Sequence, residues 1–415
     1  MEIIDLVIIG GGSAGMAAAI QAKKEGIDNL LILEKMDFLG GILNQCIHNG
    51  FGLTEFKEEL TGPEYLQRFV DQINEMKIPY KLKTAVLNIT SEKIVTFSNR
   101  LDGNVSVQAK AIILATGCYE RNAGAILLPG DRCSGIITAG TAQKYLNIHG
   151  YLCGKRIVIL GSGDIGLIMA RRLTLEGAKV ICVSEIMPYS NGLNRNIAQC
   201  LDDFGIPLYL SHSVSKVIGK GRLEKIILSK VDENFKFIPG TEIEIPCDTL
   251  ILSVGLVPYV ALLENIRTPI SSTKGALVNE HMETLIPGIF TCGNCLHVHD
   301  VVDFVTDEGR LAGHGAALYI NNQLPNQSGI NVLPKAGVSY VIPQKITSDN
   351  QEDITFKFRS QKPVKDVFVI IECGKKLLSK TFKNALIPSE MAMIKLSKEK
   401  MGALDSDITI RLEGK

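Results

Sequence analysis

The 415-residue sequence lacks the features of several protein classes. It contains no Trp, and its 44 Lys and Arg residues balance 44 Asp and Glu residues, so its formal net charge is zero. A neutral chain does not attract polyanions in general, which argues against a nucleic-acid or membrane-surface partner. The longest apolar runs are interrupted by glycine or proline, so no membrane span is expected. The first residues lack a basic stretch and a cleavage site, and we therefore expect no signal peptide and a cytoplasmic location.

The cysteines are spread through the chain and are too few for a disulfide-rich protein. Ten cysteines in 415 residues do not indicate the disulfide framework of a small secreted domain. The hydrophobic fraction of 46% and the charged fraction of 21% are those of an ordinary globular protein. The length predicts two or three domains.

The N-terminal region carries a nucleotide-binding pattern. Residues 6–9 predict a buried parallel strand, residues 16–24 have helix-forming composition, and residues 30–33 predict a second strand. Between the first strand and the helix, glycines fit G-x-G-x-x-G, which permits a tight turn, close approach of a pyrophosphate and close helix packing. The helix start adds free N–H groups, and an acid at the end of the second strand can accept ribose hydroxyls. The predicted site comprises Gly10, Gly12, Ser13, Ala14, Gly15, Glu34 and Lys35.

The same unit recurs in the middle of the chain. Residues 156–160 predict a strand, a second fingerprint follows, and residues 179–184 predict the next strand. Glu185 lies 24 residues after the first glycine, as Glu34 does in the first unit; a carboxylate there suits a free 2′-hydroxyl and repels a 2′-phosphate, which favours NAD(H) over NADP(H). An unoccupied Rossmann-like domain is the alternative. The predicted contacts are Gly161, Gly163, Asp164, Ile165, Gly166 and Glu185.

Three further apolar segments that run into a glycine, at residues 111–117, 249–255 and 288–294, complete a family pattern. With both fingerprints, they make residues 1 to about 325 similar to the two-dinucleotide-binding-domain flavoproteins, the pyridine nucleotide–disulfide oxidoreductase superfamily. The resemblance implies FAD at the first fingerprint and NAD(P)H at the second. Asn294 replaces the Asp that meets the flavin ribityl chain in the family; an amide can still hydrogen-bond there but brings no charge. Further implied cofactor contacts are Gly41, Ala115, Thr116, Gly117, Gly255 and Gly293.

The resulting fold prediction is α/β, with two Rossmann-like dinucleotide-binding domains, one inserted in the other, and a small C-terminal antiparallel β domain. We expect the FAD-binding domain at residues 1–118 and 268–325 and the NAD(P)-binding domain at 119–267. Residues 321–334 read as a linker. Alternating apolar runs after it, with a hairpin turn at 373–375, predict a β-sandwich over 330–415.

Several segments resemble a narrower subgroup, the FAD/NAD oxidoreductase subunits associated with opine, hydroxyproline and glycerol-3-phosphate dehydrogenases. That resemblance implies a flavoprotein that passes electrons between NAD(H) and a partner dehydrogenase subunit, within an oligomer or complex. The segments are residues 40–48, 137–143, 185–189, 195–205 and 293–303.

The dithiol of the disulfide reductases is missing. One family type carries G-G-x-C-x-x-x-x-C, but the two cysteine positions after Gly41 are Leu43 and His48, with Cys46 between them. The other type carries C-x-x-C in the nicotinamide domain, and none of the five cysteines in residues 119–267 has that spacing. We therefore expect no dithiol relay.

The sequence does contain C-x-x-C at Cys292 and Cys295, on the turn assigned to the flavin. Together with His297 and His299 it could be read as a metal set, but four ligands within eight residues lack the usual separated halves, and no metal site is predicted. Packing and flavin contact are favoured over a redox pair.

Four side chains are candidates for proton or thiol chemistry beside a flavin: Cys46, His48, His297 and His299. For the first two, the alternative is a buried thiol and a turn histidine. For the last two, it is a solvated loop with ion pairs. Nearby, Asp300, Asp303 and Asp307 share one helical face, which we expect to be solvated or to form a partner surface.

The predicted function is an FAD-dependent oxidoreductase that exchanges hydride between NAD(H) and a partner acceptor. Two alternatives stay open. One is an NADH oxidase or peroxidase that uses Cys46 as a sulfenic acid. The other is a noncatalytic flavin-binding subunit.

Overall fold

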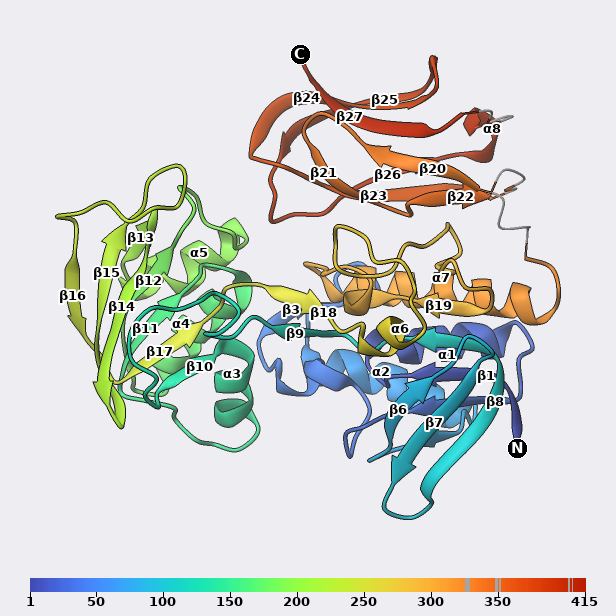
Figure 1. The fold of residues 1–415 in the computed structure, drawn as a ribbon, viewed down its shortest axis with the longest axis horizontal. Helices are drawn as coiled ribbons and strands as arrows, with labels where there is room; N and C mark the ends of the chain where they lie inside the picture. The colour runs from blue at the N-terminus through green and yellow to red at the C-terminus, as the bar shows by residue number, and fades with distance from the viewer. Residues whose placement is uncertain (325–328, 348–349, 351, 402–403, 405) are drawn as a thin grey trace. The chain divides into compact units, whose positions relative to one another are not determined.

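The computed structural model describes residues 1–324, 329–347, 350, 352–401, 404 and 406–415. The chain divides into two compact units (Figure 1), which we describe one at a time. The first unit comprises Met1–Asn44, Asn49–Cys118 and Pro258–Lys415, and the second comprises Gln45–His48 and Tyr119–Val257. None of the described helices is long and apolar enough to cross a membrane.

The first unit is built on a sheet of order β5-β2-β1-β8-β7-β6, with β19 also paired to β8. The apolar run predicted as a buried strand is β1, which pairs in parallel with β2 and β8, and β19 adds a further parallel strand. Strands β6 and β7 complete the sheet as antiparallel neighbours. The strands are β1 (Ile3–Ile9), β2 (Leu30–Leu33), β5 (Tyr80–Lys81), β6 (Ala85–Ile89), β7 (Ile94–Asn99), β8 (Gly103–Leu114) and β19 (Ile289–Thr291).

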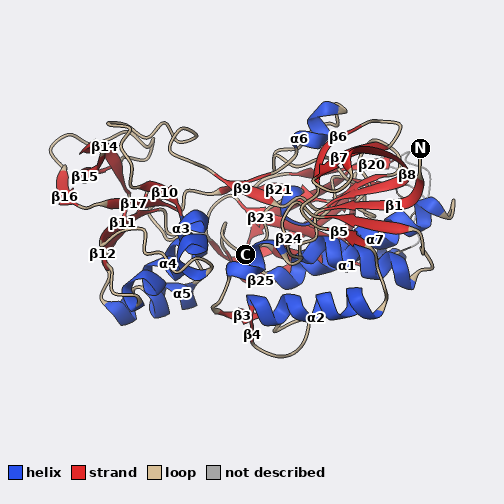
Figure 2. Cartoon of the chain, turned by 90° about the horizontal axis from the view of Figure 1, so that it is seen from below, coloured by secondary structure: helices blue, strands red, loops and turns tan. Residues whose placement is uncertain are grey.

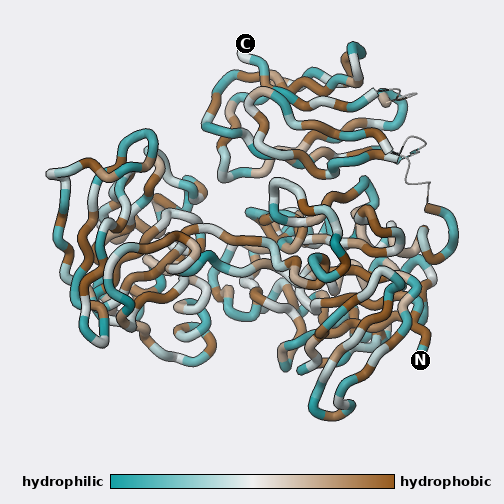
Figure 3. The backbone as a smooth tube through the Cα atoms, viewed as in Figure 1, coloured by the Kyte–Doolittle hydropathy of each residue, from teal (hydrophilic) through white to brown (hydrophobic). Residues whose placement is uncertain are grey.

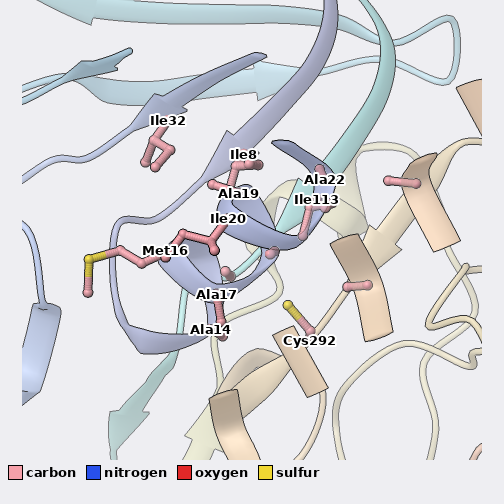
Figure 4. Packing of buried hydrophobic residues seen from close by; sticks show 14 of the residues in the cluster. Ile8, Ala14, Met16, Ala17, Ala19, Ile20, Ala22, Ile32, Ile113 and Cys292 are labelled. Carbon is pink, nitrogen blue, oxygen red and sulfur yellow. The ribbon is translucent and has the colours of Figure 1, made fainter. Parts of the chain in front are cut away.

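Helices α1 (Ser13–Lys24) and α7 (Val302–Ile320) pack closely against each other beside this sheet (Figure 2). Glycine makes the approach possible, because a Cβ at Gly309 would lie 2.3 Å from the carbonyl oxygen of Ala14, and one at Gly313 would lie 2.4 Å from that of Ala18. Alanines of α1 and the side chains of β1, β2 and β8 form one buried cluster, which also contains Cys292 (Figure 4). Helix α2 (Gly62–Glu75) also packs on α1.

The second unit repeats the parallel arrangement. Its sheet has the order β10-β17-β11-β12-β13, and every pairing in it is parallel. An antiparallel sheet, β14-β15-β16, belongs to the same unit. The helices are α3 (Ala139–Asn147), α4 (Asp164–Leu175) and α5 (Asn194–Cys200). The strands are β10 (Ile136–Thr138), β11 (Arg156–Leu160), β12 (Lys179–Glu185), β13 (Leu208–Leu210), β14 (His212–Lys220), β15 (Arg222–Lys230), β16 (Ile243–Pro246) and β17 (Thr249–Leu252).

The C-terminal region, within the first unit, forms sheets β22-β20-β27-β24-β25 and β21-β23-β26 around a common apolar cluster. Figure 3 shows hydrophobic residues alternating with polar ones along these strands. The hairpin predicted at 373–375 is confirmed, since Cys373 pairs with Lys376. The strands are β20 (Gly329–Pro334), β21 (Val338–Ile342), β22 (Lys345–Thr347), β23 (Ile354–Ser360), β24 (Val364–Cys373), β25 (Lys376–Leu386), β26 (Ala392–Leu396) and β27 (Ile408–Gly414).

The predicted fold class is confirmed: two Rossmann-like α/β parts and a C-terminal β part. Two details differ from the sequence prediction. Residues 329–334, read as linker, are strand β20, because Val332 fills the apolar cluster of the C-terminal sheets. Strand β20 also pairs with β27 in parallel, so the C-terminal part is not purely antiparallel. The middle of the expected linker, residues 325–328, lies outside the described residues.

Candidate active site

The first glycine fingerprint lies between the end of β1 and the start of α1. A Cβ at Gly10, whose φ is 107°, would lie 2.4 Å from the carbonyl oxygen of Ala115, and one at Gly15 would lie 1.9 Å from that of Gly10. These two glycines are therefore required by the packing of the chain itself. At Gly12 a Cβ would meet nothing within 4 Å. Open space at the second glycine is what the approach of a pyrophosphate requires, so the loop fits a dinucleotide.

Glu34 closes this loop from the end of β2. Its carboxylate is buried and accepts hydrogen bonds from the backbone N–H of Gly11 (2.7 Å, Oε2) and of Met36 (2.8 Å, Oε1). A carboxylate has about four acceptor positions, so one position on each oxygen stays available for a ribose hydroxyl. Lys35, the next residue, places its Nζ 5.9 Å from the centre of the Tyr259 ring.

The second fingerprint repeats this geometry within the second unit. A Cβ at Gly161 would lie 2.1 Å from the carbonyl oxygen of Ser253, whereas one at Gly163 would have 3.6 Å of clearance. Glu185 accepts from the backbone N–H (3.0 Å) and hydroxyl (2.7 Å) of Ser162 and from the N–H of Met187 (3.0 Å). Three of its about four acceptor positions are thus filled, one more than in Glu34.

The remaining predicted contacts of this fingerprint have structural partners. Gly166 packs closely, with a Cβ there 2.8 Å from the carbonyl oxygen of Gly161. Asp164 begins α4, and its Oδ1 accepts from the backbone N–H of Leu193 (2.8 Å) and the amide of Asn196 (2.6 Å). Asp164 therefore holds the start of α5 beside the fingerprint loop. Ile165 packs partly buried against the apolar cluster of this unit.

The strand-to-glycine segments lie as turns at the carboxyl ends of their strands. Thr116 donates its hydroxyl to the carbonyl oxygen of Tyr259 (2.8 Å), and the carbonyl oxygen of Gly117 accepts from the N–H of the same tyrosine (2.9 Å). Gly41, with φ 55°, approaches the first fingerprint, since a Cβ there would lie 3.4 Å from the Cα of Gly12. Gly255 has a φ of 103° in the second unit.

The turn after β19 is fixed by a buried acid that the sequence patterns do not reveal. The backbone N–H of Gly293 donates to Oε2 of Glu308 on α7 at 2.7 Å. The amide oxygen of Asn294 accepts from the backbone N–H of His299 at 3.0 Å, and Nδ1 of His299 lies 3.2 Å from it. Asn294 thus uses its oxygen within the chain and keeps its amide donors for a ligand, where the family Asp offers only acceptors.

Glu308 is the centre of a buried ionic cluster. His297 Nε2 lies 3.0 Å from its Oε1, Lys357 Nζ lies 2.7 Å from the same oxygen, and His299 Nε2 lies 3.5 Å from Oε2. All four residues are at least nine-tenths buried. The cluster joins the turn after β19, helix α7 and strand β23 of the C-terminal sheets.

Burial and charge set the proton occupancy of this cluster. Burial by itself would raise the pKa of Glu308, but Lys357 and the two histidines hold that pKa well below its ordinary value. Burial, and next the adjacent His297, lower the pKa of His299 to about 4. His299 is therefore a neutral imidazole at pH 7, whereas Glu308 is a carboxylate paired with Lys357. The alternative for His297 and His299, a solvated loop, is wrong, because 1% and 9% of their surfaces are exposed.

Two of the three acidic residues next to this cluster, Asp300 and Asp303, are internal anchors and not part of a solvated face. Asp303, 1% exposed, accepts from the backbone N–H groups of Gly52 (3.1 Å), Thr54 (2.7 Å) and Glu55 (3.2 Å). Asp300 pairs with Arg359 of β23. Asp307 is the exposed member and pairs with Arg310 at 2.9 Å.

Cys46 and His48 fall in the second unit. Their segment, Gln45–His48, is held there by Gln45, whose amide donates to the carbonyl oxygen of Gly140 at 2.9 Å. Burial raises the pKa of the Cys46 thiol to about 12. Burial, and next Arg195, lower the pKa of His48. At pH 7, Cys46 is thus a thiol, the less nucleophilic form.

Cys292 and Cys295 are embedded in the core of the first unit. Cys292 packs in the cluster with α1, and Cys295 packs in a different cluster with β6, β7 and α6 (Ala261–Asn265). The thiol of Cys295 donates to the carbonyl oxygens of Leu114 (3.1 Å) and Cys292 (3.2 Å). Burial raises the pKa of both thiols, that of Cys292 well above its ordinary value.

Comparison with known proteins agrees with this geometry. Residues 4–314 match the family model described as pyridine nucleotide-disulphide oxidoreductase. The chain belongs to this family. It is therefore an oxidoreductase of a family that binds FAD and NAD(P)H, and its two fingerprint loops provide residues that fit both nucleotides.

The individual relatives of this chain are named as different oxidoreductases. A thioredoxin reductase of Listeria monocytogenes is 25% identical over 325 residues, which are 77% of this chain and 94% of the relative. One subunit of the opine oxidase of Agrobacterium tumefaciens is 25% identical over 279 residues, 63% of this chain and 54% of the relative. Among solved structures, the T. acidophilum thioredoxin reductase is similar with a TM-score of 0.62 and 22% identity, covering 78% of this chain and 99% of that one. That structural likeness is one of fold.

Proposed function

We propose that this oxidoreductase passes electrons between NAD(H) and a partner protein, and that it does not reduce a disulfide. The partner we expect is a dehydrogenase subunit, such as one of the glycerol-3-phosphate type. The observation that carries the proposal is the state of the one C-x-x-C pair of the sequence: Cys292 and Cys295 are buried in separate apolar clusters with raised pKa values. A dithiol relay needs an accessible thiolate.

The two fingerprints indicate which part of the chain holds which nucleotide. In this proposal residues 1–118 and 268–325 hold FAD and residues 119–267 hold NAD(H). When bound, FAD supplies the chemistry that accepts a hydride and releases electrons. Glu34 accepts the ribose hydroxyls of the first nucleotide, and the amide donors of Asn294 contact the flavin side. The negative charge of Glu185 supports NAD(H), because it repels a 2′-phosphate.

The similarity of this chain to one subunit of a larger enzyme supports the proposal that it works with a partner protein. The Agrobacterium tumefaciens relative is named as one subunit of an opine oxidase, and so as one part of an oxidase. The neutral charge of the chain means that a partner would be recognised by shape and local contacts and not by bulk charge.

The test is an anaerobic titration of the purified, FAD-loaded full-length chain with NADH and with NADPH, followed by flavin absorbance. We expect NADH to bleach the flavin. A dye acceptor, dichlorophenolindophenol, should then be reduced at the expense of NADH, while the aromatic disulfide DTNB should not. DTNB turnover at a rate comparable to that of the dye would overturn the proposal. Failure of NADH to bleach the flavin would favour a noncatalytic flavin-binding subunit.

Two substitutions sharpen the result. Glu185→Gln removes the charge while keeping the size of the side chain, so the NADH preference in kcat/KM should fall by about tenfold, which corresponds to about 1.4 kcal/mol. Cys46→Ser should leave NADH-dependent dye reduction unchanged. If Cys46→Ser instead abolished peroxide or oxygen turnover with flavin reduction intact, the chain would be an oxidase or peroxidase that works through that thiol.

A further inference from the structure

A cluster of metal-ligand type lies apart from the redox site, in the first unit. His281, His314 and Glu352 each offer one ligand atom, and these atoms lie within 4.8 Å of one another. His281 lies in the segment between α6 and β19, His314 lies on α7, and Glu352 lies just before β23. Residues distant in sequence thus converge at one point, between α7 and the C-terminal sheets.

The histidines are oriented as ligands would be. Nδ1 of His314 lies 2.9 Å from both carboxylate oxygens of Glu25. If Nδ1–H donates to Glu25, the free lone pair is on Nε2, which lies 3.2 Å from Oε1 of Glu352. A carboxylate that fixes the tautomer of a histidine from behind is the usual arrangement in metal sites.

His281 adds a nitrogen that protein hydrogen bonding does not satisfy. The residue is 3% exposed, and its buried Nε2 makes no hydrogen bond. The nearest acid is Glu280, whose Oε1 lies 3.7 Å from that nitrogen. Glu280 is itself held by the backbone N–H and hydroxyl of Thr347. A buried nitrogen without a hydrogen-bond partner lowers the stability of the fold unless a ligand binds to it.

A matched cluster in the same chain shows what a compensated site looks like. The ligand-type atoms of His297, His299 and Glu308 also lie within 4.8 Å of one another, but there Lys357 lies 2.7 Å from the carboxylate and supplies the positive charge. At the other cluster, no Lys or Arg of the described residues makes an ion pair with Glu25, Glu280 or Glu352. Three carboxylates therefore face two imidazoles with no fixed cation.

We propose that His281, His314 and Glu352 bind a divalent transition-metal ion of the zinc class, with Glu25 orienting His314. Two imidazoles and one carboxylate form a known donor set for such ions and leave a fourth position for water. Metal–ligand distances of about 2.0–2.1 Å in a tetrahedron place ligand atoms about 3.3 Å apart. The 3.2 Å between Nε2 of His314 and Oε1 of Glu352 matches that spacing, and the ligand atoms of all three residues lie within 4.8 Å of one another. The ion would join α7 to the C-terminal part of the first unit, independently of the proposed electron transfer.

The experiment uses the full-length protein, treated with chelator, desalted and titrated with zinc chloride by isothermal titration calorimetry. We expect one high-affinity zinc per chain. The double variant His281→Ala/His314→Ala should lose it, whereas His149→Ala, which removes an exposed histidine of the second unit, should retain it. Glu25→Gln should weaken binding by about 10–100-fold, the usual effect of losing a carboxylate behind a ligating histidine.

The rival explanation is that His314 is a protonated imidazolium held between Glu25 and Glu352 with no ion. In that case the wild-type protein takes up no zinc at micromolar concentration, and the proposal is overturned. Zinc binding that the double histidine variant retains would overturn it as well. If that variant does not fold, as judged by circular dichroism, the half-exposed Glu352→Gln decides: weaker zinc binding supports the site, and unchanged binding rejects it.

Discussion

At the scale of single residues, the three glycines of the first fingerprint are glycine for different physical reasons. Gly10 and Gly15 are excluded from carrying a Cβ by backbone atoms at 2.4 and 1.9 Å, so the fold itself demands them. Gly12 is excluded by nothing in the chain, and its backbone angles (φ −75°, ψ −173°) are open to any residue. We therefore expect the absence of a side chain at Gly12 to serve a ligand and not the fold.

This contrast predicts separable effects on folding and on cofactor binding. Gly12→Val should leave the melting temperature of the cofactor-free protein within a few degrees of wild type but weaken FAD binding at least tenfold, because the branched side chain fills the phosphate approach. Gly15→Ala should instead lower the melting temperature or prevent folding, since its Cβ meets a backbone oxygen that cannot move away. Thermal denaturation and FAD fluorescence titration measure the two effects. A Gly12→Val protein that binds FAD like wild type would contradict the assigned phosphate position.

At the scale of elements, strand β23 inserts a buried cation against helix α7. Lys357 is 4% exposed and lies 2.7 Å from Glu308, which in turn fixes the turn at Gly293. The C-terminal sheets are thereby tied to the turn at Gly293 and Asn294, which we propose to contact the flavin. Removing one member of such a pair leaves an uncompensated charge in the core.

Lys357→Met should therefore lower the free energy of unfolding by about 3–5 kcal/mol. The double variant Lys357→Met/Glu308→Gln should recover part of the loss, because no isolated carboxylate remains. The control is Lys395→Met on β26, whose ion pair with Asp353 is largely solvated and should contribute about 0–1 kcal/mol. Urea denaturation of the three variants and of the wild-type protein makes the comparison. Equal losses for Lys357→Met and Lys395→Met would contradict the buried-pair interpretation.

At the scale of the whole molecule, the parts predictable from sequence are those set by local pattern. Strand β1, the glycine turn, helix α1 and Glu34 are consecutive, and their spacing alone places them. The Glu308 cluster could not be predicted from the sequence, because Lys357 is 49 residues away from Glu308 and belongs to a different layer of the fold. Asp303 was misjudged for a related reason: three acids on one helical face look solvated until the loop at residues 52–55 is seen to donate its N–H groups to one of them.

The buried histidine of that cluster predicts how the stability of the molecule depends on pH. The pKa of His299 is lowered to about 4 in the folded chain, against an ordinary value of about 6.5 in the unfolded chain. Between these values the unfolded state binds the proton and the folded state does not, so stability falls as the pH falls from about 6.5 to 4, by about 3 kcal/mol in total. Glu308 contributes only at the acid end of this window, because its stabilisation begins to be lost near the ordinary carboxyl pKa of about 4.5 and is lost further in more acidic solution.

The contribution of His299 is isolated by comparing wild type with His299→Gln in urea denaturation at several pH values from 7 to 4.5. Burial also lowers the pKa of His281 and His48, and the Glu25 and Glu352 pairs raise that of His314, but these groups are common to both proteins. The difference in the free energy of unfolding between the two proteins should therefore shrink toward acid, with a slope of up to about 1.4 kcal/mol per pH unit. Parallel pH profiles for the two proteins would mean that His299 takes up its proton equally in both states, and that the cluster around Glu308 opens to water.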